Sequence, residues 1–159
     1  MRSAAVAWLL DMYGFKVFLL RGGYKAYRKW VLAQFEKDHN FNIIGGYTGS
    51  GKTLLLHELK DQGKTIIDLE GLANHKGSAF GSIENKPQPG QEMFENLLAE
   101  KLHFTSESLK ASPIGRGLEG AAIYIEYESQ RIGNLQIPMP LLFCLRKTTF
   151  FFMVLPFVK

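Results

Sequence analysis

The chain has 159 residues, of which 46% are hydrophobic and 21% are charged. This length suits one domain, or one domain with part of another, and excludes a large multidomain enzyme. The composition excludes a mainly disordered chain. The net charge of +4 permits contact with a polyanion but does not by itself indicate one.

Cysteine content and hydropathy indicate the compartment. The single cysteine, Cys144, excludes an internal disulfide and a cysteine-based structural zinc site, and its apolar surroundings favour a core residue over a nucleophile. The longest apolar runs, residues 4–10 and 150–158, fall short of the roughly 18 residues that cross a bilayer. Asp11 ends the first run, and no small-residue cleavage site follows it, so a signal peptide is not favoured. The sequence therefore predicts a cytoplasmic protein without a membrane partner.

The first forty residues predict a helix, a strand, a turn and a second helix. Ser3 can cap a helix over residues 4–12, and Gly14 can supply the left-handed residue that ends it. Residues 16–20 are predicted to form a short buried strand, followed by a turn at residues 21–23.

The second helix, over residues 24–37, carries an apolar face of Tyr27, Val31 and Phe35 at i, i+4 and i+8 spacing. Residues 24–30 mix basic and aromatic side chains, a mixture that can stack on RNA and neutralise it. An amphipathic helix with a solvated basic face explains the same residues, and this second interpretation is favoured.

From residue 40 onward, short apolar runs alternate with helical patterns. Strands are predicted over 41–44, 65–69, 121–125 and 150–155, and helices over 52–61 and 91–102. Residues 86–90 and 111–120 are loops by composition. Strands alternating with helices imply an α/β fold with a parallel sheet covered by helices on both faces.

A phosphate-binding motif of the form G-x-x-x-x-G-K-T lies between the first of these strands and the next helix. It consists of Gly46, Tyr47, Thr48, Gly49, Ser50, Gly51, Lys52 and Thr53. The flanking strand and helix are the context that a P-loop requires. Its glycines let the backbone N–H groups point inward, and the helix N-terminus and Lys52 add positive charge. Thr53 would place its hydroxyl on a Mg²⁺ ion that bridges the phosphates, if a metal is used.

Acidic residues follow two of the predicted strands. Glu126, after the strand over 121–125, is the first candidate to hold the water shell of a metal ion, and Glu128 is the alternative. Asp68 and Glu70 close the strand over 65–69, where open α/β sheets place their ligand crevice. Asp68 is thus a third candidate acid.

The loop after Glu70 surrounds an imidazole and an ammonium with small residues, which suits an anion. His75, Lys76 and Ser78 are its candidate substrate-binding residues, although an ordinary surface loop explains them as well. Arg131 and Arg146 can each clamp a phosphate, and Arg131 is the fourth candidate for substrate binding.

Two further motifs give a family resemblance. Residues 68–78 read Asp-Leu-Glu-Gly-Leu-Ala-Asn-His-Lys-Gly-Ser, and residues 126–133 read Glu-Tyr-Glu-Ser-Gln-Arg-Ile-Gly. Together with the P-loop, and in this order, they closely resemble the bacterial tRNA 2-selenouridine synthases. Residues 1–3 and 20–28 resemble the end of the rhodanese domain of that family.

The resemblance implies two domains, with residues 1–38 as the C-terminal part of a rhodanese-like α/β domain and residues 39–159 as a P-loop domain. The rhodanese cysteine of the family precedes Met-Arg-Ser in its loop, so the resemblance places the catalytic cysteine upstream of Met1 and none in this chain. Residues 106–122 and 141–159 fit the family poorly. The chain is therefore expected to be a fragment, truncated at both ends.

The family replaces the sulfur of wobble 2-thiouridine in certain tRNAs by selenium from selenophosphate. An S-geranylated intermediate is made from geranyl diphosphate. The resemblance therefore implies two phosphorylated substrates for the P-loop and tRNA, at its anticodon region, as the partner. It implies no cofactor beyond an optional Mg²⁺.

Two other functions stay open on the residues alone. A small P-loop kinase or NTPase would show metal-dependent turnover of ATP or GTP. A degraded gene product without enzymatic activity would bind tRNA weakly and in a salt-sensitive way through Lys25, Arg28 and Lys29.

Overall fold

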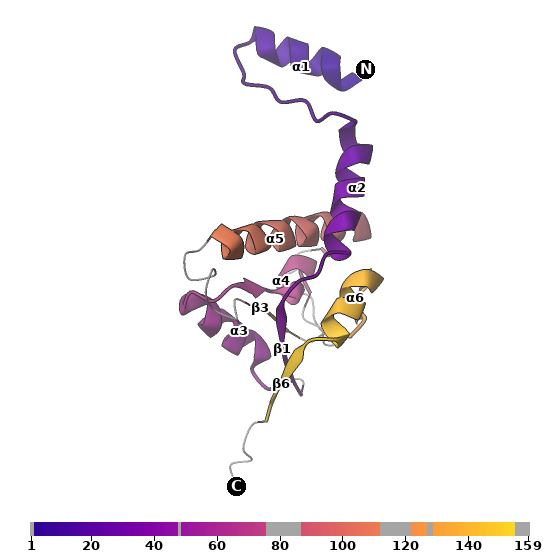
Figure 1. Cartoon of the computed structure of the whole chain (residues 1–159). Coiled ribbons are helices and arrows are strands. Elements are labelled where there is room, and N and C mark those ends of the chain that lie inside the picture. The colour runs from indigo at the N-terminus through magenta and orange to yellow at the C-terminus, as the bar shows by residue number, and fades with distance from the viewer. Residues whose placement is uncertain (1, 48, 76–86, 112–121, 127–128, 155–159) are drawn as a thin grey trace.

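A parallel β-sheet forms the centre of the fold (Figure 1). The computed structural model describes residues 2–47, 49–75, 87–111, 122–126 and 129–154. Within them the strand order is β2-β3-β1-β6, with β1 at Phe41–Gly46, β2 at Ile66–Ile67, β3 at Ile123–Glu126 and β6 at Thr149–Met153. All three strand pairs are parallel, as the alternating pattern predicts.

Helices cover both faces of this sheet, although not every helix lies on it. The described helices are α1 (Arg2–Met12), which stands apart from the sheet, α2 (Gly23–Phe35), α3 (Lys52–Asp61), α4 (Leu69–Ala73), α5 (Gln91–Ala111) and α6 (Met139–Arg146), with a hairpin of β4 (Arg131–Ile132) and β5 (Leu135–Gln136) before α6. On one face, Leu56 of α3 packs with Ile44 and Ile66. On the other, Ile43 and Ile67 pack into the larger core that α5 and α6 share. Alternate residues of each strand thus point to opposite cores, which confirms the predicted fold class.

Most predicted elements lie where the sequence placed them. The helix over 52–61 is confirmed at both ends, and Gly63 beyond it has a positive φ of 77°. The helix predicted over 91–102 continues to Ala111. The second strand is shorter than predicted, because Asp68 leaves the sheet to cap α4.

The prediction for residues 16–20 is wrong, because they form no strand. A strand needs a neighbour for its N–H and C=O groups, and neither sheet among the described residues includes this segment. Its apolar side chains are exposed, with Phe18 at 81%. Ser3 is also misassigned, since it lies within α1 rather than before it. Figure 1 shows α1 standing apart from the sheet, joined to α2 by this extended segment.

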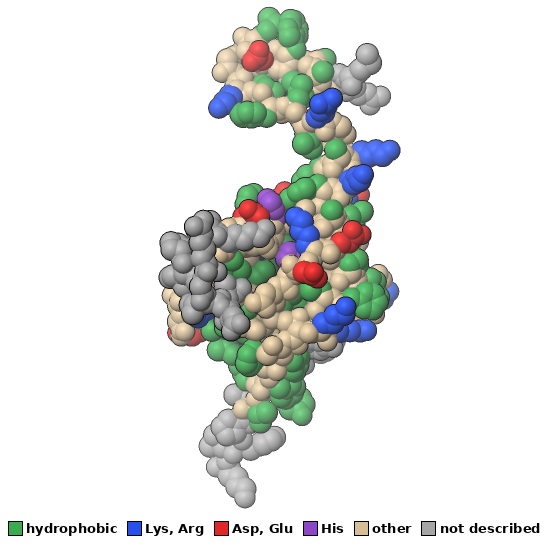
Figure 2. Space-filling view, in the orientation of Figure 1, with side chains coloured by type: hydrophobic (Ala, Val, Ile, Leu, Met, Phe, Trp, Pro, Cys, Tyr) green, Lys and Arg blue, Asp and Glu red, His purple; other side chains and the backbone are tan. Residues whose placement is uncertain are grey.

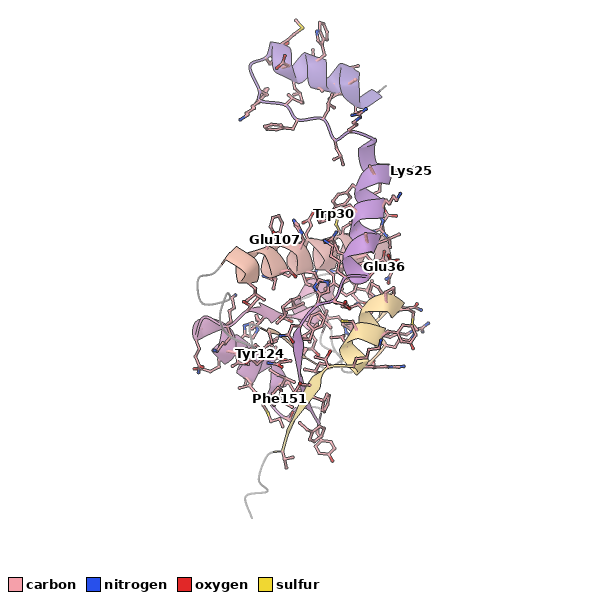
Figure 3. The ribbon with its side chains drawn as sticks, viewed as in Figure 1. Lys25, Trp30, Glu36, Glu107, Tyr124 and Phe151 are labelled. Carbon is pink, nitrogen blue, oxygen red and sulfur yellow. The ribbon has the colours of Figure 1, made fainter. Side chains whose placement is uncertain are left out.

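The basic and aromatic residues of α2 lie against α5. Arg28 forms an ion pair with Glu95 and donates to Oδ1 of Asn96 at 2.5 Å. Tyr27 donates its hydroxyl to Oε1 of Glu100 at 2.6 Å. Trp30 points from α2 towards α5 (Figure 3), with its ring centroid 5.3 Å from that of His103. The helix is amphipathic as favoured, but part of its basic face is paired with acids rather than solvated.

Cys144 is partly buried against the larger core, with its Sγ atom 3.7 Å from the carbonyl oxygen of His39. Within the described part of the chain, no helix combines the length and the apolar character needed to cross a membrane.

Candidate phosphate-binding site

The P-loop joins the carboxyl end of β1 to the N-terminus of α3. Gly49 and Gly51 have φ values of 79° and 83°, a left-handed conformation that favours glycine. Between them the loop is tied by a hydrogen bond from the Ser50 N–H to the Tyr47 carbonyl at 3.0 Å. The first N–H groups of α3 have no partner within the helix, so they point at the loop. Thr48 lies outside the described residues.

Two side chains of the loop are arranged to receive an anion. Nζ of Lys52 donates to the carbonyl oxygens of Gly46 and Tyr47 at 3.2 and 3.3 Å, so the ammonium lies against the loop. Ser50 is only 6% exposed, and its hydroxyl has no hydrogen-bond partner among the described residues. A Cβ atom on Gly46 would lie 2.5 Å from this hydroxyl oxygen, so a larger residue there would displace the Ser50 side chain. A buried hydroxyl without a partner, in the same loop as an ammonium, can donate a hydrogen bond to a phosphate oxygen.

Two carboxylates meet the first turn of α3 beside the loop. The Thr53 hydroxyl donates to Oε2 of Glu126 at 3.2 Å, and Thr53 Oγ1 lies 3.5 Å from Oε2 of Glu70. The Glu70 N–H donates to Oε1 of Glu126 at 3.3 Å. Glu126 is 1% exposed, at the end of β3. The structure therefore brings Glu126 to Thr53, whereas Glu128 lies outside the described residues.

This cluster fits a magnesium ion. A hydroxyl and two carboxylates supply hard oxygen ligands, and Mg²⁺ in phosphate sites takes one or two carboxylates with the substrate's own phosphates. No group of three or more His, Cys, Asp or Glu side chains suited to a metal occurs in the described residues, so a metal site built entirely from such side chains is not found there.

Asp68 does not join the cluster. Its Oδ1 atom accepts from the Gly71 N–H at 2.7 Å and caps α4, and its Oδ2 atom lies 3.6 Å from Nε2 of His57. Glu70, two residues later, reaches Thr53 instead. Sequence reasoning placed Glu70 only at the strand end. The signal that could have identified it is the capping pattern, because an N-cap aspartate commits its own side chain to the helix.

The candidate substrate-binding residues are not gathered at the P-loop. His75 follows α4, where its N–H donates to the Glu70 carbonyl at 3.1 Å, and its buried Nδ1 atom has no partner among the described residues. Lys76 and Ser78 lie outside those residues. Arg131 is exposed in the β4–β5 hairpin, where its backbone bonds to the Ser129 hydroxyl.

Arg146, at the end of α6, lies closer to the cluster. It lines a small cavity of about 30 Å³ together with Glu126, Gln130 and five apolar residues.

Comparison with known proteins identifies the family. The model of the tRNA 2-selenouridine synthase AAA domain matches residues 39–157. The match continues through residues 106–122 and to 157, so the expectation that residues 106–122 and 141–159 fit the family poorly is wrong for nearly all of them. No solved structure matches the chain.

Curated tRNA 2-selenouridine synthases are clearly similar. The Sulfurovum sp. protein is 39% identical over 137 residues, covering 84% of this chain and 33% of that protein. The Marinobacter nauticus protein is 40% identical over 134 residues, covering 82% and 32%. The Hydrogenovibrio crunogenus protein is 39% identical over 148 residues, covering 87% and 36%. The chain thus spans about a third of the length of these relatives, and it belongs to the tRNA 2-selenouridine synthase family, of which it carries the AAA domain.

Proposed function

We propose that the chain supplies the phosphate-binding part of an enzyme that converts wobble 2-thiouridine of tRNA to 2-selenouridine. The observation that carries the proposal is the placement of Lys52 and the buried Ser50 hydroxyl in a P-loop beside Thr53 and Glu126. Membership of the family, whose named relatives are tRNA 2-selenouridine synthases, supports the reaction.

The ligands of the loop are geranyl diphosphate and selenophosphate in this proposal. In the geranyl step, the 2-thio sulfur attacks C1 of the geranyl group and the bond from C1 to the diphosphate oxygen breaks. The diphosphate leaves with the electron pair of that bond, so negative charge grows on its oxygen. Backbone N–H groups and Lys52 stabilise this charge where it develops, which lowers the barrier. Ordinary nucleotide hydrolysis is not required of the loop.

Thr53, Glu70 and Glu126 would hold a magnesium ion if one takes part. Such an ion would neutralise part of the negative charge of the bound phosphates. The protein residues themselves set the position of the cluster, because Glu126 accepts from both the Thr53 hydroxyl and the Glu70 N–H.

The remaining parts of the proposal follow the family resemblance. His75, Lys76, Ser78 and Arg131 contact substrate, and the anticodon region of tRNA is the macromolecular partner. The catalytic cysteine belongs to a rhodanese-like domain, of which residues 1–38 are the end. The location is the cytoplasm, where tRNA is modified.

The test is the binding of inorganic diphosphate and geranyl diphosphate to the purified chain by calorimetry. Lys52→Ala is expected to weaken both about 10- to 100-fold, because a hydrogen bond to a charged partner contributes about 1.5–3 kcal/mol. Lys60→Ala, on the exposed part of the same helix, is the matched control and is expected to change neither affinity. Equal affinities of wild type and a folded Lys52→Ala variant would remove the P-loop from the proposal.

A small P-loop kinase or NTPase is the alternative, since the pairing of Thr53 with Glu126 also suits metal-dependent phosphoryl transfer. It predicts turnover of ATP or GTP with Mg²⁺ that Lys52→Ala abolishes. The proposed function predicts tight binding of geranyl diphosphate without nucleotide turnover.

A further inference from the structure

The side chain of Gln88 joins two separate segments of the described chain. Its Nε2 atom donates to the carbonyl oxygen of Ala73 at 3.4 Å and to that of Ile132 at 3.0 Å, and its Oε1 atom accepts from the Asn134 N–H at 3.0 Å. A glutamine amide has two N–H donors and one carbonyl acceptor. All of them are therefore used on main-chain groups, of α4 in one direction and of the β4–β5 hairpin in the other.

Each of these segments leads to one of the acids beside Thr53. Ala73 is the last residue of α4, three residues after Glu70, and the hairpin follows β3, which Glu126 ends. The two carboxylates lie 3.5 and 3.2 Å from the Thr53 hydroxyl oxygen. Gln88 thus bridges the segments that carry the two acids, while it makes no hydrogen bond to the P-loop among the described residues.

The bond to Ala73 matters because α4 is too short to hold its own position. Isolated helices of fewer than about 12–15 residues are marginal in water, and α4 has five. The last four carbonyl groups of a helix have no partner within it, and the Ala73 carbonyl is one of these. Asp68 fixes the first turn through the Gly71 N–H, and Gln88 holds the last residue. Glu70 lies between these two anchors.

The hairpin leaves room for this amide. Gly133, in the turn between β4 and β5, has a φ of 58°, a left-handed conformation that favours glycine. A Cβ atom on Gly133 would lie 2.5 Å from Oε1 and 2.8 Å from Nε2 of Gln88. A larger residue in the turn would therefore displace the amide from its bonds.

Gln91 offers a comparison within the same structure. Its Nε2 atom donates to the Gln136 carbonyl at 2.8 Å, and its Oε1 atom accepts from the Gln136 N–H at 2.8 Å. It also donates to Glu95 of its own helix at 2.9 Å, and it makes no hydrogen bond to α4 within the described part of the chain. Gln91 therefore holds the hairpin alone, whereas Gln88 holds the hairpin and α4 together.

We infer that Gln88 is a positioning residue that keeps Glu70 in place beside Thr53 at the P-loop. The inference rests on the proposed function and deepens it, because these two side chains and Glu126 are the ones that would receive Mg²⁺ with a bound diphosphate. Removal of a group that orients metal ligands without touching the metal typically lowers metal affinity about 10- to 100-fold. Loss of Gln88 thus weakens the metal-assisted part of diphosphate binding and leaves the part that Lys52 contributes.

The experiment measures the affinity of the full chain for inorganic diphosphate by calorimetry, with and without Mg²⁺. The ratio of the two affinities is expected to fall about tenfold in Gln88→Ala and to keep the wild-type value in Gln91→Ala. Without Mg²⁺, both variants are expected to bind diphosphate as the wild type does. Gln91→Ala is the matched control, because it removes the same side chain and two bonds to the same hairpin.

A double-mutant cycle separates positioning from a general loss of structure. Glu70→Gln removes the charge that Gln88 places, so Gln88→Ala is expected to lower the ratio little further in a Glu70→Gln background. Gln88→Glu keeps the acceptor for the Asn134 N–H but replaces the donor to the Ala73 carbonyl by an oxygen. It is expected to resemble Gln88→Ala, and it decides if the alanine variant unfolds, as judged by circular dichroism.

Three results would overturn the inference. They are an equal change of the ratio in Gln88→Ala and Gln91→Ala, independent effects of Gln88→Ala and Glu70→Gln in the cycle, and a wild type whose diphosphate affinity does not depend on Mg²⁺. A fall of the ratio in Gln88→Ala that is absent from Gln91→Ala and from the Glu70→Gln background would support it.

The proposed function and the role of Gln88 fail separately. Unchanged affinity for inorganic diphosphate in Lys52→Ala contradicts the P-loop proposal, whichever ratio the Gln88 variants show. Loss of diphosphate affinity in Lys52→Ala, with an unchanged ratio in Gln88→Ala, retains the P-loop and removes the role of Gln88.

Discussion

Asp68 and Glu70 lie two residues apart, yet their carboxylates have different roles. Asp68 accepts from the Gly71 N–H and fixes the first turn of α4, which places Glu70 beside Thr53 and Glu126. The capping contact therefore positions the acid that reaches the P-loop. At the scale of single residues, the site depends on one carboxylate that supports the backbone and two that lie beside Thr53 of the P-loop.

Substitution of Asp68 tests this division. Asp68→Ala is expected to lower the free energy of unfolding by about 1 kcal/mol, because it removes an N-cap. Asp68→Asn keeps a side-chain oxygen for the Gly71 N–H and is expected to be close to the wild type in both stability and diphosphate affinity. Urea denaturation and calorimetry measure the two quantities. A loss of diphosphate affinity in a stable Asp68→Asn variant would show that the charge of Asp68 belongs to the site.

At the scale of elements, α2 is held on α5 by a partly buried set of polar contacts. Burial and the hydrogen bond to Glu100, whose negative charge acts in the same direction, raise the pKa of Tyr27 from its ordinary value of 10.0 to about 12. The folded chain therefore holds the phenolic proton more tightly than the unfolded chain does.

This difference predicts how stability depends on pH. The stabilisation from Tyr27 is fully present below pH 10 and is lost as the pH rises through about 12, because the unfolded chain releases the proton first. The free energy of unfolding is expected to fall over this interval in the wild type and to fall less steeply in Tyr27→Phe. Urea denaturation at a series of alkaline pH values measures both slopes. Identical slopes would show that the Tyr27 hydroxyl has no special environment.

The same scale shows what the sequence could predict. The helix over 52–61 and the P-loop depend on local signals, namely glycines at left-handed positions and a strand directly before them. Arg28 of α2 contacts α5, which lies far along the chain, and a local pattern carries no signal of such a contact. The sequence therefore predicts a solvated basic face for α2, although Arg28 is paired. Residues 16–20 have the composition of a strand, but a strand also needs a neighbour, which a local pattern cannot supply.

The candidate site likewise combines residues that local signals predict with residues that they do not. Glu126 could be predicted because an acid that ends a strand beside a P-loop faces the phosphate edge of the sheet. Glu70 could not, since its position depends on the short helix that Asp68 caps.

At the scale of the whole molecule, the functional groups lie at one edge of the sheet. The P-loop follows β1, and Glu126 ends β3, which runs parallel to β1. The phosphate site and the two acids are thus contributed by neighbouring strands and the first turns after them. This placement is the one that open parallel sheets give their ligands.

The N-terminal segment around α1 exposes apolar side chains (Figure 2). Trp8 and Phe18 are among the exposed side chains of the N-terminal segment. Their assignment to a rhodanese-like domain stays a prediction.

The central claim is that the P-loop holds the diphosphate of a prenyl substrate. A crystal of the chain soaked with geranyl diphosphate tests it most directly. The diphosphate is expected in the loop, within hydrogen-bond distance of the Ser50 hydroxyl, with the Lys52 ammonium turned from the Gly46 and Tyr47 carbonyls to the ligand. An empty loop with the molecule bound elsewhere on the chain would contradict the claim.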